Sequence, residues 1–195
     1  MSTLATPDHR AFAPHTLVDV IPGGLARNIA VVLGAAALVG LSAQVAIPLP
    51  FTPVPLTLQT FAVLLTVAAL GSVRGVLSMA VYLVAGVAGL PWFSGGAHGF
   101  AFASFGYIVG FLLAAVLVGK LAEKGADRKP HTTVGLMILG NLAIYAVGVP
   151  GLMIITGMSF SHAVALGVVP FLIGDAIKIA AAAAVLPFTW KLIGR

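Results

Sequence analysis

The chain has 195 residues, of which 60% are hydrophobic and only 8% are charged, and its mean hydropathy is +1.13. Soluble domains carry about 25% charged residues, so this composition excludes a soluble fold and predicts a single all-α integral membrane domain in a lipid bilayer. The absence of cysteine excludes disulfides, thiolate metal sites, iron–sulfur clusters and a cysteine nucleophile.

The net charge is +5. In a soluble protein such a charge would suggest a nucleic-acid partner. Here the basic residues lie in short segments between apolar runs, where membrane topology explains them more simply, and no nucleic-acid partner is expected. Residues 1–25 are polar and mixed, without the features of a signal peptide. We expect them to form a cytoplasmic tail ahead of a membrane domain at residues 26–195.

Six apolar segments follow the tail in chain order. A helix that crosses the bilayer needs roughly 20 predominantly apolar residues, and the shorter segments must borrow residues from their flanks. The last segment is interrupted by Pro170 and Gly174. The six predicted membrane helices are Asn28–Ala46, Leu56–Gly71, Gly75–Leu90, Phe105–Leu121, Val134–Thr156 and Ala163–Ile193.

The basic residues are distributed on one side of these six segments. Nine of the ten Lys and Arg residues lie on that side, either outside the segments or, for Lys120 and Lys191, within the last three residues of a segment that ends there. The positive-inside rule then predicts that both termini are cytoplasmic. Five or seven membrane helices would scatter the charges over both sides. The tenth basic residue, Lys178, lies inside the last segment.

The connections on the other side differ from those on the basic side. Between the first two segments, IPLPFTPVP contains four prolines, which favour a stiff, extended backbone. Between the third and fourth, LPWFSGGAHGFAFAS contains Gly95, Gly96 and Gly99, which permit tight turns and close backbone approach. We therefore expect Gly95 and Gly96 to contact a ligand. The two loops are consistent with a lid on this face, and equally with ordinary connections between hydrophobic helices.

Small residues recur at helical spacing in the first segment, where Ala30 pairs with Gly34 and Ala36 with Gly40. Such pairs allow another helix to approach closely, either inside the bundle or from a partner protein.

Isolated polar residues in the middle segments are candidates for ligand contact. Gln59 can both donate and accept hydrogen bonds, and Asn141 could bond a ligand or a neighbouring helix. Tyr107 and Trp92 lie near the ends of segments, where aromatic residues often mark the membrane interface. The histidines are scattered among the loops and predict no metal site.

The last segment contains Asp175 and Lys178 in an otherwise apolar run. A charge at the centre of the bilayer costs at least about 2.5–3.5 kcal/mol. Their spacing of three residues places both on one helix face, within pairing distance. They could form an ion pair without further function, or a proton relay. We favour a ligand site, because a carboxylate and an ammonium together match a ligand with N–H groups beside a carbonyl or carboxylate.

The sequence contains no phosphate-binding loop, no H-E-x-x-H motif and no G-x-S-x-G motif. We therefore expect no enzymatic activity and no cofactor. If this chain moves a ligand with energy from ATP, partner subunits must hydrolyse the ATP.

Four motifs in order resemble the BioY family over roughly residues 30–190. They are PLPFTPVPLTLQTFAVLL, GVLSMAVYLVAGVAGLPWFSGG, GYIVGFLLAA and PFLIGDAIK. The family comprises the biotin-binding S components of energy-coupling factor (ECF) transporters. The resemblance implies a six-helix protein of the bacterial cytoplasmic (inner) membrane that captures biotin with high affinity. It also implies a transmembrane coupling subunit and ATPase subunits as partners.

The resemblance also implies roles for individual residues. Asp175 and Lys178 match the family's G-D-x-x-K motif, Gln59 its T-L-Q segment and Tyr107 its G-G-Y turn. That turn here reads SFGY, and the glycine loop reads GGAHG, so both are less glycine-rich than usual. We expect Asp175 to accept a hydrogen bond from a ureido N–H of biotin, and Lys178 to donate to the ureido carbonyl or to orient the aspartate. The residues that would face the coupling subunit are Ala30, Gly34, Ala36 and Gly40.

Three alternatives stay open from the sequence. The chain could be a self-sufficient or proton-coupled carrier in which Asp175 titrates, an S component for another vitamin, or an intramembrane enzyme, although no second catalytic group is evident. The sequence also leaves open whether the protein works alone, as a homo-oligomer or only with partner subunits.

Overall fold

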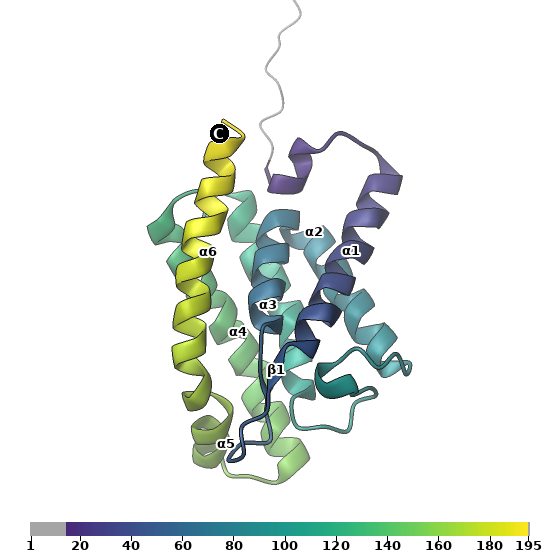
Figure 1. Cartoon of the computed structure of the whole chain (residues 1–195), viewed down its shortest axis with the longest axis vertical. Helices are drawn as coiled ribbons and strands as arrows, with labels where there is room; N and C mark the ends of the chain where they lie inside the picture. Colours follow the sequence, from purple (N-terminus) through teal and green to yellow (C-terminus); the bar gives the residue numbers. More distant parts are fainter. Residues whose placement is uncertain (1–14, 195) are drawn as a thin grey trace, which may run out of the picture.

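A computed structural model describes residues 15–194 as a bundle of long helices (Figure 1). Five of its helical stretches are long and apolar enough to cross a membrane. The α-helices are α1 (Leu25–Gln44), α2 (Gln59–Val87), α3 (Phe105–Glu123), α4 (Pro130–Thr156), α5 (Phe160–Gly167) and α6 (Leu172–Leu192). The 3₁₀ helices are η1 (Leu17–Val20), η2 (Ser94–Gly96) and η3 (Val169–Phe171). The strands β1 (Ala46–Ile47) and β2 (Leu56–Thr57) pair antiparallel.

Helix α2 reverses direction at Gly71. This residue has φ 81° and ψ −179°, a backbone conformation that favours glycine. Gly75 lies against Val67, and the Gln59 side-chain amide donates to the Tyr82 hydroxyl at 2.8 Å. In a straight helix, residues 59 and 82 would lie about 34 Å apart. The two halves of α2, residues 59–70 and 72–87, therefore run side by side in opposite directions, as the second and third predicted segments do.

The last predicted segment is broken where Pro170 was expected to break it. Helix α5 ends at Gly167, the backbone at Val168 is not helical, and Pro170 lies within η3. The expected interruption at Gly174 was wrong, because this residue lies inside α6. A Cβ atom at Gly174 would come within 3.2 Å of the Leu56 side chain, so this glycine permits close packing of the β2 segment.

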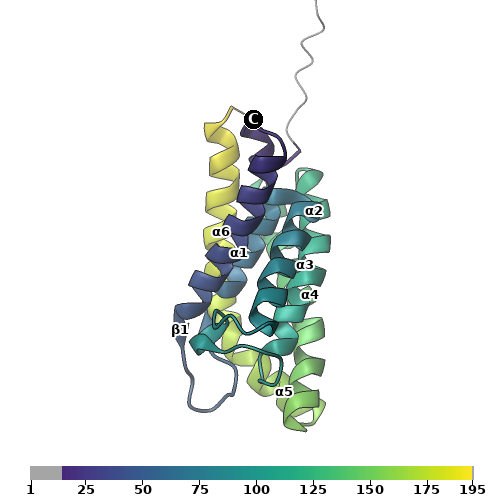
Figure 2. The same cartoon turned by 90° about the vertical axis from the view of Figure 1, so that its right-hand side faces the viewer.

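The basic residues of the described chain lie at one end of the bundle, except for Lys178. Helix α1 begins and α6 ends at this end (Figure 1). The reversal at Gly71 and the α3–α4 connection are there too, since Gly71 contacts Glu123 at the end of α3. We call this the basic end. The paired strands, η2 and α5 gather at the opposite end (Figure 2).

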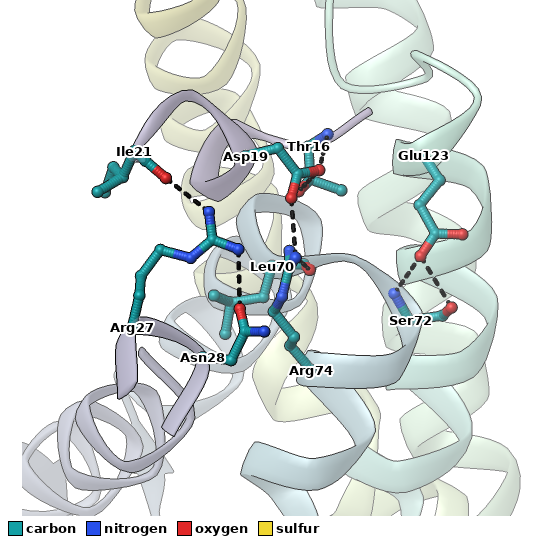
Figure 3. Close-up of polar contacts among 9 residues, drawn as sticks. All are labelled: Thr16, Asp19, Ile21, Arg27, Asn28, Leu70, Ser72, Arg74 and Glu123. Atoms are coloured by element: carbon teal, nitrogen blue, oxygen red, sulfur yellow. Dashed lines mark hydrogen bonds and ion pairs between the residues drawn. The ribbon is translucent and has the colours of Figure 1, made fainter. Parts of the chain in front are cut away.

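Polar contacts at the basic end join η1 to α2 and α2 to α3 (Figure 3). Asp19 accepts hydrogen bonds from the backbone and side chain of Thr16, and it forms an ion pair with Arg74 at 2.9 Å. Burial alone would raise the pKa of Asp19, but the bonds from Thr16 and Arg74 outweigh it and lower the pKa. Residues 15–24 of the expected tail thus include a segment packed on the bundle, and residues 1–14 lie outside the described part.

Helix α3 packs closely on both sides because glycines on it allow backbone contact. Gly106 meets Gly151 of α4, and Gly110 meets the backbone of Ile144. On the other side, a Cβ atom at Gly119 would lie 2.4 Å from the backbone nitrogen and Cα of Ser72. The Ser72 backbone N–H and hydroxyl both donate to Glu123, at 2.7 and 2.9 Å (Figure 3).

Asp127 and Trp190 join the α3–α4 connection to the end of α6. Both residues are buried, and the Trp190 indole N–H donates to Asp127 at 2.6 Å. Burial raises the pKa of Asp127, although the bond from Trp190 and the charge of Arg128 act in the opposite direction. The Arg128 guanidinium lies 4.5 Å from the centroid of the Trp190 ring. This cluster therefore anchors the final turns of α6.

The raised pKa of Asp127 predicts a dependence of stability on pH. In the unfolded chain the Asp127 carboxyl has its ordinary pKa of 3.8, and in the folded protein its pKa is higher. In the pH interval between these two pKa values, the unfolded chain has released the proton while the folded protein still holds it. The free energy of unfolding therefore falls as pH rises through that interval, and then stays lower. Thermal unfolding of the purified protein and of Asp127→Asn between pH 4 and 8 checks this. The wild type should lose stability relative to the variant as pH rises; parallel curves would contradict the prediction.

Candidate functional site

A cavity of about 600 Å³, counting its open mouth, lies between the helices near the end opposite the basic end. Its walls come from α2, α3, α4 and α6, and its rim comes from the β2 region and the segment before α3. The lining residues are Val54, Pro55, Leu56, Thr57, Gln59, Thr60, Ser94, Ser104, Tyr107, Ile108, Phe111, Asn141, Ile144, Tyr145, Phe171, Asp175 and Lys178.

Asp175 and Lys178 form the polar centre of this cavity. The Lys178 Nζ atom lies 3.6 Å from the Asp175 Oδ1 atom, and Asp175 is only 5% exposed. The Tyr145 hydroxyl donates to the other carboxylate oxygen of Asp175, and Lys178 donates to the Thr60 hydroxyl at 2.8 Å. Asp175 also lies in the first turn of α6, where the helix dipole favours a negative charge. Side chains from α2, α4 and α6 thus fix both charges.

Gln59 occupies the first turn of α2 at the cavity wall. Its amide donates to Tyr82, whose hydroxyl in turn donates to the Trp92 carbonyl at 3.3 Å. The Trp92 indole donates back to the Tyr82 carbonyl at 3.0 Å. A buried network therefore connects the cavity wall to the loop after α2.

Tyr107 lies on the same cavity, in the first turn of α3. Its hydroxyl donates to the Gly167 carbonyl at 2.9 Å, and its ring meets Tyr145 edge-on with centroids 6.3 Å apart. Asn141 is buried on α4 and borders the cavity one helical turn before Tyr145. The hydrogen bond from Tyr107 therefore links this wall of the cavity to the end of α5. Asn141 places an amide group on the wall formed by α4.

Three predicted contacts are not among the lining residues. Trp92 packs against Tyr82 with ring centroids 5.0 Å apart, and it fills the space beside Gly40. Gly95 and Gly96 have positive φ angles in η2 and turn the backbone next to Ser94, which does line the cavity. The glycine loop thus borders the cavity through a serine.

Both of the loops that could form a lid border the cavity. Val54 and Pro55 come from the proline-rich loop, and Ser94 comes from the glycine-rich loop. The Thr52 hydroxyl donates to the Leu166 carbonyl of α5 at 2.7 Å, and the Gln44 amide donates to the carbonyl of Trp92 at 3.0 Å. Each loop is therefore tied to a helix beside the mouth.

The small residues of α1 divide between two faces. Ala30 and Gly34 are exposed, and the space beside Gly34 is open. Ala36 and Gly40 are buried, and Gly40 lies against Trp92. Only the first pair is accessible to a partner in this arrangement.

Thr60, a residue of the charged network, was not among the predicted site residues, and the bond from Tyr145 to Asp175 was not predicted. Tyr145 lies four residues after Asn141, so it shares the same helix face, and Thr60 directly follows Gln59. Spacing could therefore have indicated both, although their hydrogen bonds to Asp175 and Lys178 depend on how three helices are rotated. Within residues 15–194, no group of three His, Asp or Glu residues could hold a metal ion.

The chain resembles known proteins in sequence and in fold. The sequence model of the BioY family matches residues 10–195. The biotin transporter BioY of Thermotoga maritima is 39% identical over 140 residues, which cover 70% of this chain and 81% of the relative. The biotin transporter BioY of Rhizobium etli is 34% identical over 161 residues, which cover 77% and 86%.

A crystal structure of the S-component for biotin from an ECF-type ABC transporter has a similar fold. The TM-score is 0.76 at 22% identity, over 85% of this chain and 92% of that chain. The matched motifs, the extent of the family match and the curated relatives lead to one conclusion: the chain belongs to the BioY family.

Proposed function

We propose that this protein captures biotin at the cavity described above, as the substrate-binding S component of an ECF-type importer. The observation that carries the proposal is the charged pair of Asp175 and Lys178 in a largely apolar cavity. Biotin has a ureido ring with two N–H donors and one carbonyl acceptor, next to an apolar bicycle. A carboxylate and an ammonium side by side complement that edge.

In the proposed complex, Asp175 accepts a hydrogen bond from a ureido N–H and Lys178 donates to the ureido carbonyl. Gln59 and Asn141 offer further donors and acceptors, while Tyr107 and the apolar lining hold the rings. Ligands that lack these polar atoms would leave the buried pair unmatched, which makes such a site selective. The names of the curated relatives support biotin as the ligand.

We propose six membrane crossings in residues 26–195: α1, the two halves of α2, α3, α4, and α5 with α6. The basic end then faces the cytoplasm of a bacterium with both termini, and the cavity opens toward the outside. A transmembrane coupling subunit and ATPase subunits complete the transporter, with Ala30 and Gly34 on the face that the coupling subunit contacts.

Calorimetric titration of the purified protein in detergent tests the proposal. We expect tight binding of biotin and no heat from other vitamins. If the folded protein binds no biotin, the proposal fails; heat from another vitamin would instead identify an S component of different specificity. Uptake by liposomes that contain this chain alone, driven by a pH gradient, would favour the proton-coupled carrier.

A further inference from the structure

Lys178 is held in place from two directions. Its ammonium group donates to Thr60 Oγ1 at 2.8 Å and lies 3.6 Å from Asp175 Oδ1. A lysine ammonium has three N–H donors on a flexible four-carbon stem, so its direction depends on what binds it. With one N–H donated to Thr60 and the ammonium paired with Asp175, an N–H remains that can reach a ligand in the cavity.

Thr60 differs from a second threonine on the same helix. The Thr66 hydroxyl donates to the carbonyls of Ala62 and Val63, at 2.7 and 3.0 Å, which is the usual local bond of a helical threonine. The Thr60 hydroxyl instead accepts a bond from a residue 118 positions away on α6. Hydrogen bonds from a charged donor are roughly twice as strong as neutral ones. Thr60 is therefore a specific partner of the lysine.

We propose that Thr60 is a positioning residue for Lys178. Through this lysine it makes the site prefer a ligand with a carbonyl at the position of the ureido oxygen over a ligand with a cationic group there. The proposal rests on biotin being the ligand. With Thr60 in place, the Lys178 ammonium donates its remaining N–H to the ureido oxygen. A ligand with a cationic group in place of that oxygen is repelled by the fixed charge of the ammonium. Without the hydroxyl, Lys178 turns toward Asp175, so the bond to the carbonyl and the repulsion of a cation both weaken.

The analogue 2-iminobiotin tests this selectivity, because an imino nitrogen that is protonated at neutral pH replaces the ureido oxygen. Biotin and 2-iminobiotin are each titrated against bound radiolabelled biotin, and the displacement gives the affinity for each ligand. The purified full-length proteins compared are the wild type, Thr60→Val, Thr60→Ser and Thr66→Val. In Thr60→Val we expect the affinity for biotin to fall about tenfold, as for loss of one charged hydrogen bond. The affinity for 2-iminobiotin should stay within about twofold, so the ratio of the two affinities narrows about tenfold. Thr60→Ser and Thr66→Val should keep the wild-type ratio.

Two results would overturn the inference. An unchanged affinity for biotin in Thr60→Val would show that the hydroxyl does not position the lysine. An equal loss for both ligands would show that Thr60 supports the fold or contacts a part that both share. Thr60→Ala gives the same comparison if the valine variant does not fold. Failure of the folded wild type to bind biotin would contradict the proposed function instead, before any variant is compared.

Discussion

Asp175→Asn should lower the affinity for biotin by at least about a hundredfold. The substitution keeps the size of the side chain but removes the negative charge of the carboxylate. This carboxylate pairs with Lys178 and accepts a hydrogen bond from the Tyr145 hydroxyl. Breaking a buried ion pair also costs about 3–5 kcal/mol of folding stability, because it leaves the other charge unpaired. The ureido N–H of the ligand loses its charged acceptor at the same time. Calorimetry on the purified variant measures the loss directly.

Two further variants separate the loss of binding from a loss of folding. Asp175→Asn combined with Lys178→Met removes the unpaired charge, so it should recover thermal stability without recovering binding. Asp127→Asn makes the same chemical change at a buried carboxylate at the basic end, away from the cavity, and should bind biotin like the wild type. Near-native affinity in Asp175→Asn would refute the assignment of this residue to the ligand.

Gly119→Ala should destabilise the bundle by about 3 kcal/mol, the upper part of the usual range for overpacking. The new Cβ atom would lie 2.4 Å from backbone atoms of Ser72 and 2.7 Å from the carbonyl carbon of Gly71. Backbone cannot move aside as the end of a long side chain can, so α3 must shift away from the reversal in α2. The bonds from Ser72 to Glu123 would be strained by the same movement.

Gly135→Ala is the matched control for this change. Gly135 lies inside α4, and nothing stands within 4 Å of the position that its Cβ would take. Alanine should there stabilise the helix by roughly 0.5–1 kcal/mol, since it restricts the unfolded chain more than glycine does. Thermal unfolding of both variants in one detergent gives the comparison. Equal stability of Gly119→Ala and the wild type would contradict the close approach of α3 to the reversal.

The residues that the sequence could identify are those whose chemistry conflicts with a membrane interior. Asp175 and Lys178 stand out because charges in an apolar segment are costly, and their spacing alone predicts that they pair. Gln59, Tyr107 and Asn141 also line the cavity. The apolar runs, with Gly71 at the end of one of them, indicated both halves of α2. These features depend on composition and local spacing, which a sequence displays directly.

The features that were missed depend on how the helices are rotated and packed. Ala30 with Gly34 and Ala36 with Gly40 have the same spacing, so the pattern cannot tell the exposed pair from the buried pair. Trp92 was a candidate for ligand contact because it is aromatic and near a loop, but its side chain packs against Gly40 of α1. Tyr145 and Thr60 acquire their roles only from side chains on α6.

The reversal at Gly71 also bears on how the chain enters the bilayer during synthesis. Helices of about 12 and 16 residues on its two sides rise only about 18 and 24 Å, less than the hydrocarbon thickness of about 30 Å. With a single residue between them, neither half has a loop that could be translocated separately, so we expect the insertion machinery to receive the two as one hairpin. The acceptor for the Ser72 amide, Glu123, is synthesised 51 residues later. The tip of the hairpin therefore gains its hydrogen-bond partner only when α3 arrives beside it.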